Sequence, residues 1–146
     1  MEQPDFSALA AAMFGTEGKV DLEAADRLWT ALFRLPLWYV LMSPQSAMDN
    51  QPSAQLIEEK VWLLAFTDKE KLAHYAARNK NLDAQGNALS LDLAPAQCVE
   101  LGRTLQHSNV FGFRFNEAQQ HGWYIPMTDF LRIPDYLGEK GLLPAP

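Results

Sequence analysis

Two short, uninterrupted apolar runs constrain the fold more than any other feature of this sequence. They are LWYVLM at residues 37–42 and VWLLAF at residues 61–66. Both contain aromatic and β-branched side chains and have the length of a buried strand. The first follows a stretch whose apolar residues recur at helical spacing from Leu22 to Phe33, with Asp21 as a good N-cap and Pro36 just beyond its end. Strands joined directly to helices predict a sheet covered by helices.

The residues before and after the second apolar run predict further structure: a strand or turn before it and a helix after it. Residues 54–66 read either as a strand pair with a tight turn at residues 58–60, or as one long strand with a bulge there. Thr67 and Glu70 have the spacing of a capping box, in which each side chain bonds a backbone N–H group of the first helical turn. A helix is therefore expected to start at Asp68 and to run to Arg78 or Asn79.

The second half of the chain predicts more strands. Residues 88–93 alternate between apolar and polar, as a half-exposed strand does, and Pro95 can open the next helix. Residues 110–115 and 122–125 are two further strands, joined by a link too short for a parallel crossover, so they form an antiparallel hairpin. Alternation along the first of these strands puts Phe111, Phe113 and Phe115 on one face, and Gly112, Arg114 and Asn116 on the other.

The remaining segments complete one domain over residues 1–146. Residues 6–14 are a short Ala-rich helix within a loose N-terminal part (1–20), and residues 43–53 have the composition of an exposed loop. Residues 128–137 predict a short helical piece broken by Pro134, and residues 138–146 a loose tail. The expected fold is α/β (mixed α+β): a mixed sheet of about five or six strands packed by three to four helices, with a C-terminal β-hairpin and without purely parallel winding.

The charge of the chain limits the classes of partner that are expected, and its cysteine content indicates a cellular compartment. The chain has 18 acidic and 12 basic residues, a net charge of -6, and no window with the Lys/Arg cluster that a phosphate backbone requires, so nucleic acid is not expected as a partner. The acids gather in the first 27 residues, as a solvated face or as a surface for a basic partner. A lone Cys98 favours the cytoplasm. The acidic start does not resemble a signal peptide, and membrane insertion is not expected.

A search for reactive groups finds no catalytic constellation. Cys98 falls on the apolar stripe of its helix, where a thiolate is disfavoured. The histidines, His74, His107 and His121, are too far apart in sequence for a metal site. Neither a phosphate-binding glycine loop nor a nucleophile elbow is present. The sequence therefore predicts a protein that is not an enzyme and has no metal or cofactor.

The predicted hairpin carries the best candidates for binding. Its side chains include a cation, an amide and two large aromatics, which together can hold a peptide or a small polar ligand. These candidate binding residues are Arg114, Asn116, Trp123 and Tyr124. The alternative is that the aromatics pack in the core and Arg114 covers a solvent face. The other tryptophans, Trp29, Trp38 and Trp62, are assigned to the core.

The run VWLLAFTDKEKLAHYA, residues 61–76, resembles the N-terminal domain of the SseB family, named for enhanced serine sensitivity in bacteria. In that family a strand ends in a Phe-Thr pair before a charged helix start, as AFTD does here, and LWTALFRLPLWYVLM at 28–42 is similar to the helix and strand that precede it. The likeness continues through residues 89–116, and it covers about residues 25–125. The chain departs from the family in having Glu117, where members often have proline. The resemblance implies a small bacterial cytoplasmic module with a regulatory role and no catalytic residues.

Three functions remain as alternatives. The first is a non-catalytic interaction or regulatory module, with an exposed apolar patch that includes Trp123 or the 43–53 loop and binds a protein partner. The second is a small-molecule sensor, or an enzyme of unrecognised type, with a cleft near Arg114 and Asn116. The third is an acidic immunity or antitoxin-like protein that binds a basic effector. A homodimer is possible under each of them, through an edge strand at residues 37–42 or at the hairpin.

Overall fold

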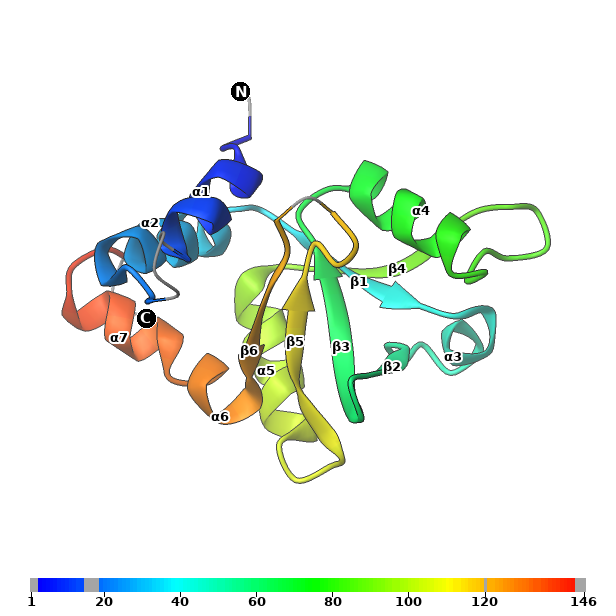
Figure 1. Ribbon diagram of the computed structural model, residues 1–146. Helices are drawn as coiled ribbons and strands as arrows, with labels where there is room; N and C mark the ends of the chain where they lie inside the picture. Colours follow the sequence, from blue (N-terminus) through cyan, green and yellow to red (C-terminus); the bar gives the residue numbers. More distant parts are fainter. Residues whose placement is uncertain (1–2, 15–18, 120, 144–146) are drawn as a thin grey trace.

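A computed structural model describes residues 3–14, 19–119 and 121–143, and these form a mixed sheet with helices on both faces (Figure 1). The strands are β1 (Trp38–Met42), β2 (Ala54–Ile57), β3 (Lys60–Phe66), β4 (Leu89–Leu93), β5 (Val110–Phe115) and β6 (Trp123–Pro126). The helices are α1 (Phe6–Met13), α2 (Leu22–Phe33), α3 (Pro44–Met48), α4 (Lys69–Arg78), α5 (Pro95–Leu105), α6 (Met127–Phe130) and α7 (Ile133–Glu139). The predicted fold class is confirmed.

The sheet has the strand order β4-β1-β3-β5-β6, with β2 paired beside the first half of β3. Among the strand pairs of the described residues β3–β5 alone is parallel, and β5 and β6 form the expected antiparallel hairpin. Residues 54–66 are a strand pair with a tight turn, which decides between the two possibilities that the sequence left open. The expectation that residues 37–42 lie at an edge is wrong, because β1 pairs with β3 on one side and with β4 on the other.

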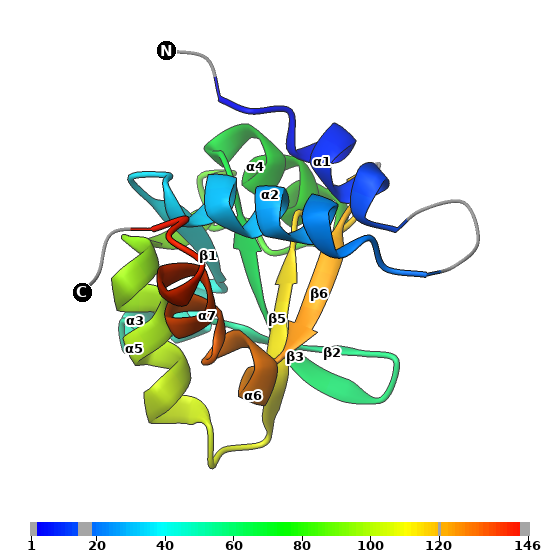
Figure 2. The ribbon, with the colours of Figure 1, turned by 90° about the vertical axis from the view of Figure 1, so that its left-hand side faces the viewer.

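The two faces of the sheet are covered very unequally. Helices α1, α2, α5, α6 and α7 lie over one face, which turns toward the viewer in Figure 2, and they enclose the larger core around Trp38, Phe115 and Phe130. The other face carries α4, which packs on β1 and β3 through Leu72, Tyr75 and Ala76. Burying apolar area on both faces fixes the sheet between two layers, but one helix cannot cover the whole of the second face.

The start of α4 differs from the predicted capping box. Asp68 is the N-cap, and its carboxylate accepts a hydrogen bond from the backbone N–H of Lys71 at 2.8 Å. Thr67 is 1% exposed and bonds the side chain of Asn116 instead. The predicted Thr67–Glu70 capping box is therefore wrong, and the N-cap lies one residue later. Aspartate is as good an N-cap as threonine, and the buried hydroxyl of Thr67 is already bonded to Asn116.

A bulge in β5 changes the face on which Phe111 lies. Val61 pairs with Val110, but the next residue, Trp62, pairs with Gly112, so Phe111 is an extra residue in its strand. Its ring lies against Trp62, while Phe113 and Phe115 are in the larger core. The prediction that all three phenylalanines share a face is wrong, because strict alternation does not hold across a bulge.

The helix expected over residues 6–14 is present, and the described parts of the 43–53 segment and of the expected C-terminal tail contain more helix than predicted. Helix α1 packs into the larger core through Phe6, Ala10 and Met13, while Gly15, its expected end, lies outside the described residues. The 43–53 segment contains the short helix α3, capped by Ser43. Pro134 stands in the first turn of α7 and does not break a helix. Of the expected tail, residues 138 and 139 belong to α7, and residues 142 and 143 pack against the core.

Candidate binding face

The part of the second sheet face that α4 leaves uncovered is the candidate binding site, here called the open face. It is formed by Trp62 of β3, Phe111 and Arg114 of β5, and Tyr124 of β6. Tyr124 is 56% exposed and Phe111 37% exposed, whereas Trp62 beneath them is only 2% exposed. Neighbouring strands thus place a buried ring under two accessible ones.

The aromatic rings of the open face hold one another in place. The ring centroid of Trp62 lies 5.0 Å from that of Phe111 and 5.4 Å from that of Tyr124, and both contacts are edge-to-face. The indole N–H of Trp62 donates to the carbonyl of Ile57 at 3.2 Å. Edge-to-face pairs add about 0.5–1.5 kcal/mol each beyond the area they bury. The exposed rings therefore stand on a rigid support, which lowers the entropy that a partner's binding would cost.

The guanidinium of Arg114 is surrounded by two aromatic rings and two carboxylates. Its guanidinium carbon lies 4.7 Å from the ring centroid of Trp62 and 5.3 Å from that of Tyr124. The guanidinium also forms ion pairs with Glu58 and Glu117, both at 3.3 Å. The side chain is only 11% exposed, and its Nε has no hydrogen-bond partner among the described residues. Arg114 is thus a fixed part of the face, with its charge offset by two carboxylates.

The turn between β2 and β3 brings further charge to the rim of the open face. Glu58 and Glu59 both have positive φ, 52° and 70°, as the two central residues of a type I′ hairpin turn require. This turn holds Glu58 within reach of Arg114 and places the ammonium of Lys60 4.0 Å from the ring centroid of Phe111. Charges of both signs therefore surround the exposed rings, as in the polar rim of a protein interface.

A hollow of about 370 Å³ borders the open face on the side of the β5–β6 turn. It is lined by Arg114, Glu117, Ala118, Gln119, Gly122, Trp123 and Tyr124. Tyr75 of α4 lies near its charged groups: burial raises the pKa of Tyr75, the negative charge of Glu117 raises it further, and Arg114 opposes both effects. The phenol of Tyr75 stays neutral at ordinary pH.

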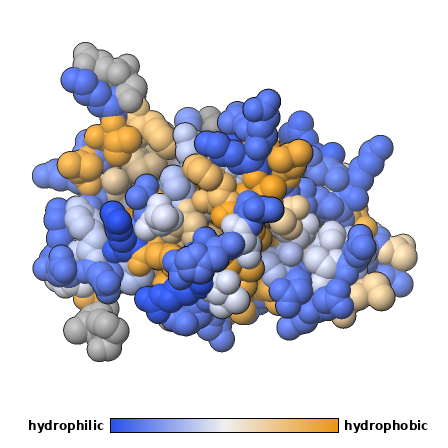
Figure 3. Space-filling model, turned by 90° about the horizontal axis from the view of Figure 1, so that it is seen from below, coloured by the Kyte–Doolittle hydropathy of each residue, from blue (hydrophilic) through white to orange (hydrophobic). Residues whose placement is uncertain are grey.

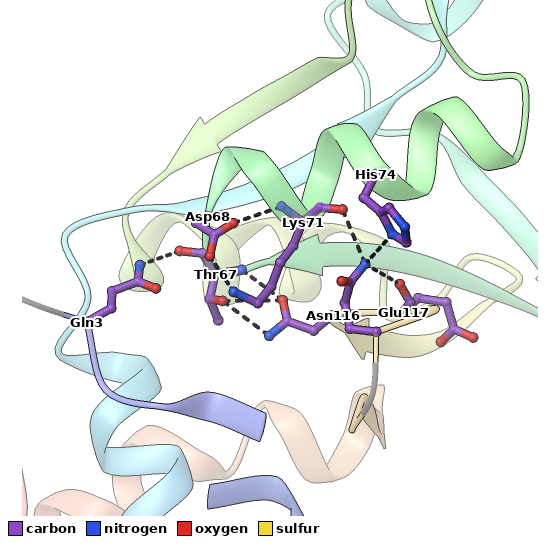
Figure 4. A network of polar contacts seen from close by, with 8 residues as sticks. Gln3, Thr67, Asp68, Lys71, His74, Asn116 and Glu117 are labelled. Atoms are coloured by element: carbon purple, nitrogen blue, oxygen red, sulfur yellow. Dashed lines mark hydrogen bonds and ion pairs between the residues drawn. The ribbon is translucent and has the colours of Figure 1, made fainter. Parts of the chain in front are cut away.

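The structure places Asn116 away from the open face, at the corner where the parallel strands β3 and β5 end (Figure 4). Its side-chain oxygen accepts from the backbone N–H of Thr67 at 3.0 Å, and its amide nitrogen donates to the Thr67 hydroxyl at 3.1 Å. Asn116 is 2% exposed and has a φ of 52°, a conformation that asparagine tolerates well. It is a structural tie between two strand ends, with both of its polar atoms already bonded.

Trp123 is also absent from the open face. It is 2% exposed and stacks on Phe115 and Phe6, with centroid distances of 5.5 and 6.2 Å. The expectation that Trp123 forms part of an exposed patch is wrong. Adjacent residues of a strand point to opposite faces, so Trp123 and Tyr124 could not both be exposed on one sheet face. That alternation was visible in the sequence and would have separated the two.

Sequence reasoning missed Trp62, Phe111, Glu58 and Glu117 as members or neighbours of the face. The assignment of Trp62 to the core is confirmed, as it is for Trp29 and Trp38, but Trp62 also supports the exposed rings. Glu117 stands three residues after Arg114, a spacing that can be read from the sequence. Glu58 could not have been found, because 56 residues separate it from Arg114.

The described residues include neither a cluster of metal ligands nor a readily ionised cysteine. Among them, no group of three or more histidine, cysteine or acidic side chains could hold a metal ion. Cys98 is buried, and burial raises the pKa of its thiol to about 12, so the reactive thiolate is not populated at neutral pH. Within the described ranges no helix combines the length and apolar character needed to cross a membrane.

Comparison with known proteins adds no family to this picture. A search against protein-family models finds no match for the chain, and a search of curated proteins finds none either. The resemblance of residues 61–76 to the SseB family therefore stays a prediction, and the geometry of the open face carries the functional argument.

Proposed function

We propose that this chain is a non-catalytic binding module whose open face docks a protein partner. The observation that carries the proposal is that the rings of Tyr124 and Phe111 are exposed to solvent. They pack on the buried ring of Trp62, and Arg114 contacts that ring as well. Aromatic and arginine side chains dominate binding energy at protein interfaces. The partner segment has apolar or aromatic anchors for the two rings and polar groups for the charged rim of Glu58, Lys60 and Glu117.

The rest of the exposed surface supports this choice of face. Other exposed apolar side chains lie on different elements, among them Met48 on α3, Leu56 on β2 and Leu22 on α2. Seen from below, hydrophobic groups lie at several places on the surface with hydrophilic groups between them (Figure 3). Isolated apolar residues are ordinary on a protein surface, whereas grouped aromatics on one sheet face are informative.

The test is a binding measurement with matched variants. A partner captured from a bacterial lysate is purified, and its Kd is measured by calorimetry for the wild type, Phe111→Ala, Tyr124→Ala and Tyr136→Ala. Tyr136 of α7 is an aromatic residue with 37% exposure and serves as the control. Truncating a central interface aromatic costs about 2 kcal/mol or more, so Kd is expected to rise roughly thirtyfold for the open-face variants.

The control variant, Tyr136→Ala, shows whether a loss of binding is specific to the open face. Tyr136→Ala should leave Kd within about twofold of the wild type, since surface contacts outside an interface carry little binding energy. If all three variants bind equally well, the partner uses another surface and the open face is not the docking site. Circular dichroism of each variant shows whether a loss of binding reflects a loss of fold.

A second function, the binding of a small molecule, is favoured by the hollow beside the open face. Arg114, Glu117 and Gln119 converge on it with Tyr124 at its side, and its size of about 370 Å³ lies in the range of ligand sites. The protein's thermal midpoint in the presence of a library of amino acids and small carboxylates tests this reading. A specific stabilisation lost in Gln119→Ala would support a ligand site there, and an unchanged midpoint throughout would remove it.

The third alternative, in which acidic residues of this chain bind a basic effector, has less support from the structure. Asp5 and Asp21 are helix N-caps, and Asp26 bonds Tyr136 and Lys140 of α7, so these carboxylates already have structural partners. Glu2 and Glu17 lie outside the described residues. We keep as proposals a cytoplasmic location, a bacterial source and the relationship to the SseB family, which rest on the lone buried Cys98 and on the sequence resemblance.

A further inference from the structure

Strand β4 forms one edge of the sheet, and it lies far from the open face in the strand order. In the described part of the chain its strand partner is β1, and Ala88, the residue just before it, forms an isolated bridge with Leu82. Its sequence is Leu-Ser-Leu-Asp-Leu, and four of these five side chains are half-buried. Leu91 and Leu93 pack against the larger core, while Asp92 faces α4 and pairs with Lys69 at 3.4 Å.

The other edges of the sheet carry features that discourage pairing, whereas on β4 the Leu82–Ala88 bridge lies just before the first strand residue and β1 is the one strand paired with Leu89–Leu93 among the described residues. Strand β6 has four residues and ends in Pro126, which lacks a backbone donor. Strand β2 has four residues and runs into the charged turn at Glu58 and Glu59. Strand β4 has five residues and no proline, and its single charge is offset by Lys69. An edge of this kind is a template for a further strand.

We propose that two copies of this chain pair through β4, antiparallel about a two-fold axis at Leu91, to form one continuous sheet. This inference is independent of the proposed function, because it uses a different surface. The sequence of β4 is self-complementary in that register: Leu91 meets Leu91 of the second copy, Leu89 meets Leu93, and Ser90 meets Asp92. A two-fold interface requires this self-complementarity. The hydroxyl of Ser90, which donates to Asp92 within the chain, can donate to Asp92 of the second copy instead.

The register gives a specific crosslinking test. In a Cys98→Ala background, Leu91→Cys places two thiols opposite each other across the axis, with Cα atoms about 5 Å apart, within the range a disulfide spans. Ser90→Cys places them two positions out of register, about 8 Å apart, beyond that range. Mild oxidation should crosslink the first variant and leave the second uncrosslinked. Equal crosslinking of both would contradict the register.

Solution mass tests the dimer without any oxidation. Sedimentation equilibrium of the wild type should show a mass that rises to twice the chain mass with concentration. Ser90→Asp sets two carboxylates against Asp92 of the second copy and should weaken dimerisation roughly tenfold, while Ser90→Lys should strengthen it by a similar factor. A monomer at every concentration, or the same response to both charges, would overturn the proposal. Thermal unfolding of each variant at low concentration checks that the monomer is intact.

Discussion

Trp123 and Tyr124 are consecutive residues of β6 with opposite environments. A shift of one position along the strand decides whether an aromatic ring is buried or exposed. One ring is enclosed between Phe6 and Phe115, and the other stands beside Arg114 at the surface. Both are large aromatics, so residue type alone could not assign them to core or site. Their environments follow from alternation along the strand together with the unequal covering of the two sheet faces.

Trp123→Ala is expected to lower the free energy of unfolding by about 3–5 kcal/mol, because it leaves a cavity among buried aromatic rings. Tyr124→Ala should cost about 1 kcal/mol or less, since its ring is mostly in solvent and loses only its contacts with Trp62 and Arg114. Urea denaturation followed by circular dichroism measures both. Equal losses for the two variants would contradict the assignment of Tyr124 to the surface.

The cap of α4 provides a second contrast at the residue scale. Asp68→Ala removes the carboxylate that bonds the first helical turn, and the free energy of unfolding should fall by about 1 kcal/mol. Glu70→Ala should change it by only about 0.5 kcal/mol or less, because Glu70 is exposed and does not complete a capping box. Chemical denaturation of the two variants distinguishes them. A larger loss for Glu70→Ala would restore the capping box expected from the sequence.

At the scale of elements, the sequence predicted which segments are helices and strands better than it predicted how strands meet. The strand runs at 37–42 and 61–66, the Asp21 cap and the β5–β6 hairpin all follow from local patterns. The bulge at Phe111 does not, because it depends on the register between β3 and β5, two strands separated by α4, β4 and α5. The place of β1 inside the sheet is likewise set by non-local pairing.

Gly112 has a role that only the pairing of β5 with β6 reveals. A Cβ atom at this position would lie 2.0 Å from the carbonyl oxygen of Ile125, so the two backbones approach too closely for any side chain. Gly112→Ala should lower the free energy of unfolding by about 1–3 kcal/mol, as overpacking does. Gly138→Ala in α7 meets no atom within 4 Å and should instead stabilise by about 0.5–1 kcal/mol. Thermal melts that rank the two variants in the opposite order would contradict this pairing geometry.

At the scale of the whole molecule, the layered core explains both what is rigid and what remains free. Five helices close one face of the sheet, and α4 closes only part of the other. Of the four residues predicted to bind, Arg114 and Tyr124 lie together on the open face, while Asn116 and Trp123 are buried and make contacts within the fold. Alternation along β6 separates Trp123 from Tyr124 in the sequence, but it could not show which sheet face is left open, since that depends on where α4 packs.

Cys98 in the larger core makes stability depend on pH in the alkaline range. Burial raises the pKa of its thiol from 9.0 to about 12, so the unfolded chain loses this proton at lower pH than the folded one. The neutral thiol's contribution is fully present below pH 9.0 and is lost as the pH rises toward 12. The wild type should lose on the order of 1 kcal/mol relative to Cys98→Ala between pH 8 and pH 10. Urea titrations at both pH values measure the difference, and a constant difference would show that Cys98 is not enclosed.

The central claim, that a protein partner docks on the open face, is tested most directly by a hydrogen-exchange footprint of the complex. The account predicts slower exchange on binding at the backbone amides of Phe111, Arg114 and Tyr124, with no change in α2 and α7 on the far side of the sheet. Protection confined to the helical side, with β5 and β6 unchanged, would contradict it.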